Sequence, residues 1–177
     1  MNKLTAVIAM FLLSTSFCYT QYVWTGIIYH YQTGSIPPPH YYSYDLTINN
    51  DGVGLLVYSP GYGGDTSWNY NMTIDEASIN KLNDEIQKSK VLIGSIQSLP
   101  KDKQPIGGPI LYVTIILNDT NPNADHPPTN IVTPYFPTQE YKEALDSLYN
   151  TIIKLVPQSV WDEIDRDKEA YTKKHSK

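Results

Sequence analysis

Oxygen-bearing side chains at alternate positions of one loop form the pattern in this sequence that comes nearest to a metal site. They belong to Asp119, Asn121, Asn123 and Asp125. The first ligands of an EF-hand calcium loop have the same spacing, but Ala124 stands where that loop requires glycine and Asn130 where it requires a bidentate glutamate. Because Asn, Asp and Pro are also ordinary loop residues, the sequence predicts at most a low-affinity calcium site and no other cofactor.

Tyrosine is the unusual part of the composition, with 15 residues in the chain, many of them within residues 29–44 and 58–70. A tyrosine ring combines an apolar face with a polar edge, which suits recognition of a peptide or a carbohydrate. The alternative is that these rings pack a sheet against its helices, since alternation turns half of residues 41–44 inward. The candidate binding residues are therefore those in or beside two loops: His40, Tyr41, Tyr62 and Trp68.

No local enzymatic motif is present in the sequence. There is no Gly-x-Ser-x-Gly, no His-Glu-x-x-His and no kinase signature. Residues 61–64 are rich in glycine but lack the Lys-Ser/Thr pair of a phosphate-binding loop, and the histidines lack the spacing of zinc ligands. We therefore assign no catalytic residue and expect a protein that acts by binding. A carboxylate such as Asp65 is the candidate if the chain instead hydrolyses a polysaccharide.

The first residues have the layout of a cleavable signal peptide. Lys3 is followed by the mostly apolar, uncharged run from Leu4 to Phe17, and a membrane-spanning helix would need roughly 20 such residues. We expect residues 1–20 to be removed and the remainder to be secreted or periplasmic, without a transmembrane segment. The alternative is a lipid anchor on Cys18, although Phe17 stands where lipoprotein signals have a small residue. Cys18 is the only cysteine, which excludes an internal disulfide.

The charge of the chain argues against two classes of partner. The formal net charge is −5, and Arg166 is the only arginine. A nucleic acid or an anionic membrane surface requires a basic patch. Neither is therefore expected to be a partner.

Hydrophobic periodicity divides the rest of the chain into strands and helices. Alternating apolar residues at 41–58, around a turn at 50–52, predict a β-hairpin. Further strands are predicted at 22–31, 67–72, 110–117 and 131–135, with the first four strands in a meander and the strand at 110–117 central in the sheet. Helices are predicted at 74–89, from 138 to about 155, and at 159–171. Thr73 and Glu76 have the spacing of a capping box, and residues 172–177 are expected to form a flexible tail.

This order predicts one α+β domain at residues 21–171, a two-layer sandwich in which an antiparallel sheet of about five to six strands packs against two to three helices. A rigid sheet with aromatic loops, an acidic surface and no catalytic set favours a small secreted or periplasmic binding protein. We expect its partner to be another envelope or secreted protein, as for an inhibitor or an immunity protein. The alternatives are a glycan-binding module or polysaccharide hydrolase of the envelope, and a purely structural envelope component.

Overall fold

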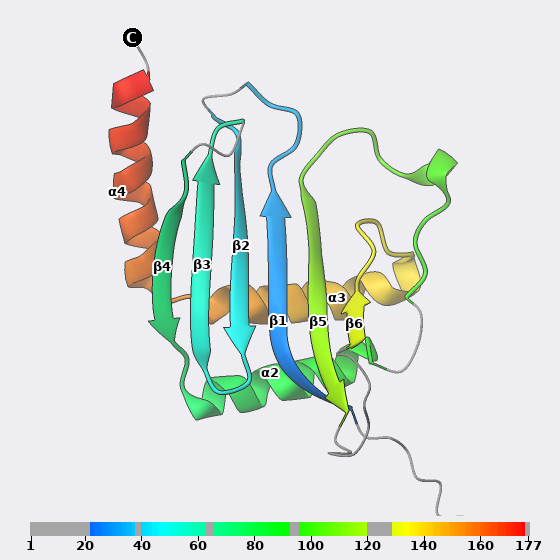
Figure 1. Ribbon diagram of the computed structural model, residues 1–177. Helices are drawn as coiled ribbons and strands as arrows, with labels where there is room; N and C mark the ends of the chain where they lie inside the picture. The colour runs from blue at the N-terminus through cyan, green and yellow to red at the C-terminus, as the bar shows by residue number, and fades with distance from the viewer. Residues whose placement is uncertain (1–21, 38–39, 63–65, 93–95, 120–128, 176–177) are drawn as a thin grey trace, which may run out of the picture.

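In the part of the chain that the structure describes, six strands form one antiparallel sheet, and three α-helices pack on one of its faces (Figure 1). The structure is a computed structural model that describes residues 22–37, 40–62, 66–92, 96–119 and 129–175. The strand order is β4-β3-β2-β1-β5-β6. The strands are β1 (Tyr22–Gln32), β2 (Tyr42–Asn49), β3 (Val53–Pro60), β4 (Trp68–Thr73), β5 (Ile110–Asp119) and β6 (Thr129–Val132). The predicted α+β sandwich is confirmed.

The first four strands form the predicted meander, in which neighbours in sequence are neighbours in the sheet. The β2–β3 hairpin turns at Gly52, whose φ of 85° is in the left-handed region. The Asp51 carboxylate stabilises this turn, because it accepts a hydrogen bond from the backbone N–H of Val53 at 3.0 Å. On the other edge of β1, β5 pairs antiparallel and β6 follows it, so β5 is an interior strand as its apolar sequence predicts.

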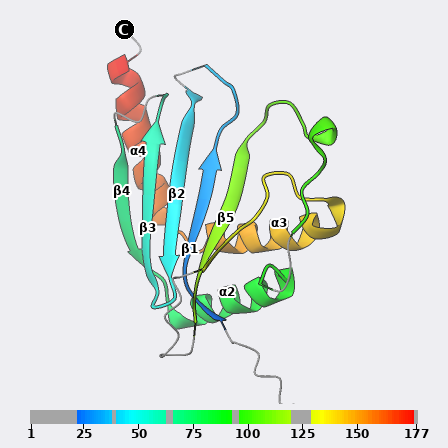
Figure 2. The same cartoon turned by 45° about the vertical axis from the view of Figure 1, so that its right-hand side comes forward.

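Alternation along the strands separates a buried face of the sheet from an open one. The helices α2 (Glu76–Ser89) and α3 (Gln139–Lys154) cross behind the sheet, and α4 (Gln158–His175) runs beside β4 (Figures 1 and 2). The aliphatic side chains that are completely buried include Ile27, Leu46, Ile48, Leu56, Leu82, Val91, Val113, Ile115, Leu145, Leu148 and Ile152. Burial of each such side chain stabilises the fold by about 1.5–3 kcal/mol. No described helix covers the other face.

The predicted capping box at the start of α2 is wrong. Thr73 is still part of β4, where it pairs with Val53, so it cannot cap the helix. Asp75 is the N-cap instead, and its carboxylate accepts hydrogen bonds from the backbone N–H of Ser78 at 2.9 Å and from its hydroxyl at 2.8 Å. The helix therefore begins two residues later than the Thr-x-x-Glu spacing suggests.

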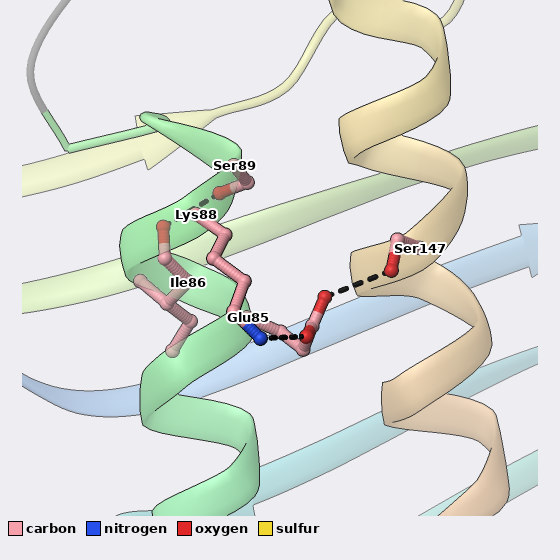
Figure 3. A network of polar contacts seen from close by, with 5 residues as sticks. All are labelled: Glu85, Ile86, Lys88, Ser89 and Ser147. Carbon is pink, nitrogen blue, oxygen red and sulfur yellow. Dashed lines mark hydrogen bonds and ion pairs between the residues drawn. The ribbon is translucent and has the colours of Figure 1, made fainter.

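Glu85 connects α2 to α3 on the outer side of the helix layer. Its carboxylate accepts hydrogen bonds from the Lys88 ammonium and from the Ser147 hydroxyl, each at 2.8 Å (Figure 3). These two bonds, the one from Lys88 first, lower the pKa of Glu85. At the end of α2, the Ser89 hydroxyl donates to the Ile86 carbonyl at 2.6 Å and the next residue adopts a left-handed conformation. The Glu85–Ser147 bond therefore holds α2 and α3 together, and α2 ends at Ser89.

Two boundaries differ most from the predicted ones. β6 ends at Val132 rather than at Tyr135, because Pro134 has no N–H to donate to a neighbouring strand. Residues 172–175, predicted to belong to a flexible tail, continue α4 to His175. No glycine or proline interrupts residues 158–177, and the basic residues Lys173 and Lys174 suit the carboxyl end of a helix. A short 3-10 helix, η2 (Lys101–Lys103), precedes β5.

Substitution of Gly52 tests how strictly the hairpin turn is specified. We expect Gly52→Ala to destabilise the fold by more than about 2 kcal/mol, because it adds the cost of a left-handed φ to a clash. The new Cβ would lie 2.4 Å from the Ile74 carbonyl oxygen. Urea unfolding followed by circular dichroism measures the loss.

Gly107 is the matched control for this prediction. Its φ of 82° is equally left-handed, but nothing lies within 4 Å of an added Cβ. Gly107→Ala should therefore cost only about 1 kcal/mol. Equal losses for the two variants would show that the contact between the turn and Ile74 does not constrain the hairpin.

Candidate functional site

Three loops gather at the end of the sheet where β1 and β3 finish and β5 begins (Figure 1). We call this region the loop end; its described residues are 33–37, 40–41, 61–62, 66–67 and 104–109. The rings of Tyr41 and Tyr62 stack there, with centroids 4.0 Å apart and planes inclined by 21°. The Tyr62 hydroxyl donates to the Ile36 carbonyl at 2.6 Å. Two predicted binding residues from different loops are thus in direct contact.

The third loop contributes an exposed aliphatic side chain that inspection of the sequence missed. Ile106 is fully exposed, and the two glycines after it have φ values of 82° and 88°. This loop packs closely against the loop that follows β1, because a Cβ on Gly34 would lie 2.6 Å from the Gly108 carbonyl oxygen. An isoleucine between Pro105 and Gly107 was the available signal, because an apolar residue in a loop of turn-forming residues has no core to enter.

Two small cavities flank Tyr41. One of about 250 Å³ lies between the loops, with Tyr62 and Phe136 in its wall. The other, of about 290 Å³, is bordered by His40 and by Lys168 of α4. The backbone N–H of His40 donates to the Pro37 carbonyl at 2.9 Å. The structure therefore brings His40, Tyr41 and Tyr62 into one region.

Trp68 does not belong to this region. Its indole stacks on Tyr58 with centroids 5.5 Å apart, and Tyr171 of α4 meets it edge-on at 6.0 Å. Both contacts are on the helix side of the sheet, where Trp68 is half-buried against the core. Its position in β4, in phase with the buried Tyr70, explains this placement. Trp68 therefore stabilises the packing of α4 on the sheet.

Most strand tyrosines also pack the helix side rather than a binding surface. Rings in mutual contact at 5.1–6.1 Å run across the middle strands and on to the helices, and their members are Tyr29, Tyr31, Tyr42, Tyr44, Tyr58, Tyr149 and Trp161. Burial raises the pKa of Tyr29, Tyr42 and Tyr149 to about 12. Burial also raises the pKa of Tyr44 and Tyr58. These rings therefore pack the sheet against its helices. A role in recognition is left to the tyrosines of the loops.

His30 lies on the open face of the sheet and not beside His40. Its Nδ1 is 2.5 Å from a carboxylate oxygen of Asp45, its partner across β1 and β2. The imidazole also packs on Tyr112, with ring centroids 4.8 Å apart. No group of three or more His, Cys, Asp or Glu side chains that would hold a metal is found among the described residues. The His30–Asp45 pair is thus a local hydrogen-bonded pair on a sheet surface.

Several predicted features lie outside the described residues. These are the signal peptide, Cys18, Asp65 and three of the four calcium candidates, Asn121, Asn123 and Asp125. Asp119 is the last residue of β5, where its backbone pairs with Tyr22. The calcium site therefore stays a prediction.

Comparison of the sequence with protein-family patterns and with curated proteins finds no match. Among the described residues, no helix has both the length and the apolar content needed to cross a membrane. The functional argument therefore depends on the geometry of the site.

The raised tyrosine pKa values predict a loss of stability in alkali. A tyrosine has a pKa of about 10 when unfolded, and Tyr29 has one of about 12 in the fold. Its contribution is fully present below pH ~10 and is lost as the pH rises toward ~12, because only the unfolded chain releases the proton. Urea unfolding at a series of pH values should show this fall.

Tyr29→Phe isolates one group in this series. The variant cannot release that proton, so the slope of unfolding free energy against pH between about 10 and 12 should be shallower than in the wild type. Comparison of slopes cancels any change in packing that is the same at every pH. An unchanged slope would show that Tyr29 does not supply the linkage.

Proposed function

We propose that this protein is a small secreted or periplasmic binding protein that captures another protein of the envelope or the medium at its loop end. The proposal extends the expectation of an inhibitor or immunity-type protein to a defined surface. Its contact residues are Tyr41, Tyr62 and Ile106, with His40 at the margin.

The stacked pair of Tyr41 and Tyr62 carries this proposal. Tyr62 is 52% exposed, yet its ring lies 4.0 Å from Tyr41 and its hydroxyl is bonded to the Ile36 carbonyl. An exposed ring that is already fixed loses little conformational entropy on binding. Tyrosine is also among the residues most enriched where binding energy concentrates. The geometry is that of a preorganised anchor.

The shape of the loop end favours a macromolecule over a small metabolite. The cavity between the loops holds about 250 Å³, whereas small-molecule sites enclose roughly 300–1,000 Å³. Ile106 projects fully into solvent nearby, which provides a protruding apolar contact. A protein partner with a shallow pocket for these side chains would bury both without entering a deep cleft.

A glycan is the second candidate, and the cavity beside α4 supports it. This cavity of about 290 Å³ is lined by Tyr41 and Tyr42 together with Lys168, whose ammonium lies 5.2 Å from the centre of the Tyr42 ring. Aromatic faces pack on sugar rings, and a lysine would pair with an acidic sugar. Binding of the purified protein to a glycan array, lost in Tyr42→Ala, would favour this candidate.

Replacement of Tyr62 tests the proposed function directly. The tagged protein is incubated with envelope and medium fractions of its source, the retained protein is identified by mass spectrometry, and its affinity is measured by biolayer interferometry. We expect Tyr62→Ala to weaken binding by at least about 30-fold, the effect of losing a central aromatic anchor. Its melting temperature should stay within about 3 °C of the wild type.

Two further variants serve as controls. Tyr135 has nearly the same exposure as Tyr62, 51% against 52%, but its ring packs on Tyr112 rather than on Tyr41, so Tyr135→Ala should retain the partner. Trp68→Ala should instead lower the melting temperature, because its ring packs on Tyr58 and Tyr171. An empty eluate from a folded protein, or a Tyr62→Ala variant of unchanged affinity, contradicts the proposal.

A further inference from the structure

The face of the sheet opposite the helices carries almost no charge. Its central row crosses all six strands in the order Val132, Thr114, Ile28, Thr47, Leu55 and Asn71. The next row toward the loop end consists of Tyr112, His30, Asp45, Val57 and Asn69. The outward strand residues that the structure describes include no lysine, arginine or glutamate and a single aspartate. That aspartate, Asp45, is paired with His30.

The charges of the chain are instead concentrated on the helix layer. α4 alone has the sequence QSVWDEIDRDKEAYTKKH, and α2 and α3 carry lysines and carboxylates along their outer sides. The chain has a net charge of −5. The solvated face of an antiparallel sheet normally carries polar and charged side chains, because strand residues alternate between the core and water. Depletion of charged side chains is a feature of the fully buried core of protein interfaces.

We propose that this open face packs against the same face of a second copy of the chain, so that two sheets form the inside of a four-layer homodimer. Sheets pack face to face about 10 Å apart through interdigitating side chains. Half-buried Leu55, Val57 and Ile116 and the more exposed Val53 and Val132 supply apolar surface for such packing. Threonine and asparagine side chains in the same rows supply hydrogen-bond donors and acceptors.

The size of the face matches what a stable dimer requires. Strands lie about 4.8 Å apart and advance about 3.4 Å per residue, so six strands of roughly eight residues outline a face of about 700 Å². Specific protein–protein interfaces bury about 800 Å² on each partner. Because side chains stand above the sheet, the accessible surface exceeds its outline, and the open face suffices without any loop.

The distribution of charge is compatible with a second copy as the occupant. Two acidic chains repel each other through most of their surface, but packing of the open faces places both helix layers outward, as far apart as the fold allows. A two-fold axis brings each row against a copy of itself, which is tolerated where the row is neutral. His30 and Asp45 enter the interface already paired, so no isolated charge is buried.

Sedimentation velocity and light scattering of the purified protein test this inference between about 1 and 100 µM, the range over which a micromolar dimer dissociates. We expect the wild type to have twice the mass of its chain at the upper end of this range. Thr47→Lys places a lysine in the central row of each copy and should raise the dissociation constant at least 100-fold.

Asn80→Lys is the matched control, because it adds the same charge at an exposed position of α2, on the other layer, and should stay dimeric. Circular dichroism verifies that each variant is folded; if Thr47→Lys is not, Asn71→Lys at the end of the same row replaces it.

A wild type that stays monomeric throughout, leaving the face to a different macromolecule, overturns the inference. A dimer that survives the lysine substitution on the face overturns it as well. Binding of the partner at the loop end is measured separately. Its contact residues are not part of the open face, so one proposal can fail without the other.

Discussion

Tyr44 lies at the centre of the helix-side face, in contact with the rings of Tyr29, Tyr31 and Tyr42, while Trp161 of α4 meets it edge-on at 5.8 Å. Because successive side chains of a strand point to opposite faces, a slip of one residue in β2 would turn this ring to the open face and leave a hole under α4. Packing of these rings therefore determines strand register and helix position together. The hydroxyls of Tyr29 and Tyr44 remain neutral at ordinary pH, since burial raises their pKa.

The same rings hold the bases of two loops at the loop end. Tyr42 is one residue beyond Tyr41, and its backbone exchanges hydrogen bonds with Thr33 through the N–H, carbonyl and hydroxyl groups at 3.0–3.1 Å. The N–H of Gly61 donates to the Tyr41 carbonyl at 2.8 Å. Both loops thus leave the sheet from positions that the buried rings hold in place. A preorganised Tyr41–Tyr62 pair follows from core packing, and a contact surface built on it needs little further ordering.

Charge is distributed as unevenly as aromatic content. Carboxylates and lysines lie on the helices, aromatic side chains lie under the sheet and at its loop end, and the open face is neutral apart from the His30–Asp45 pair. Such a division leaves two surfaces for association, one small and preorganised and the other broad and flat. The two surfaces fit different partners. The aromatic anchor at the loop end fits a pocket on a partner, and the neutral open face fits another sheet.

The sequence by itself determined the strands, the helices and the α+β class, because periods of 2 and 3.6 are local properties of the chain. The sequence also indicates that Trp68 points to the core, because it shares the phase of Tyr70 and Met72 in β4. Its place beside a loop, which predicts a binding residue, is the weaker signal. What only the tertiary structure decided was that Tyr41 stacks on Tyr62, that Ile106 stands beside them and that Asp75 rather than Thr73 caps α2. The first two depend on contacts between loops far apart in the chain, which no local period encodes, and the third depends on how far β4 pairs with β3 before the helix begins.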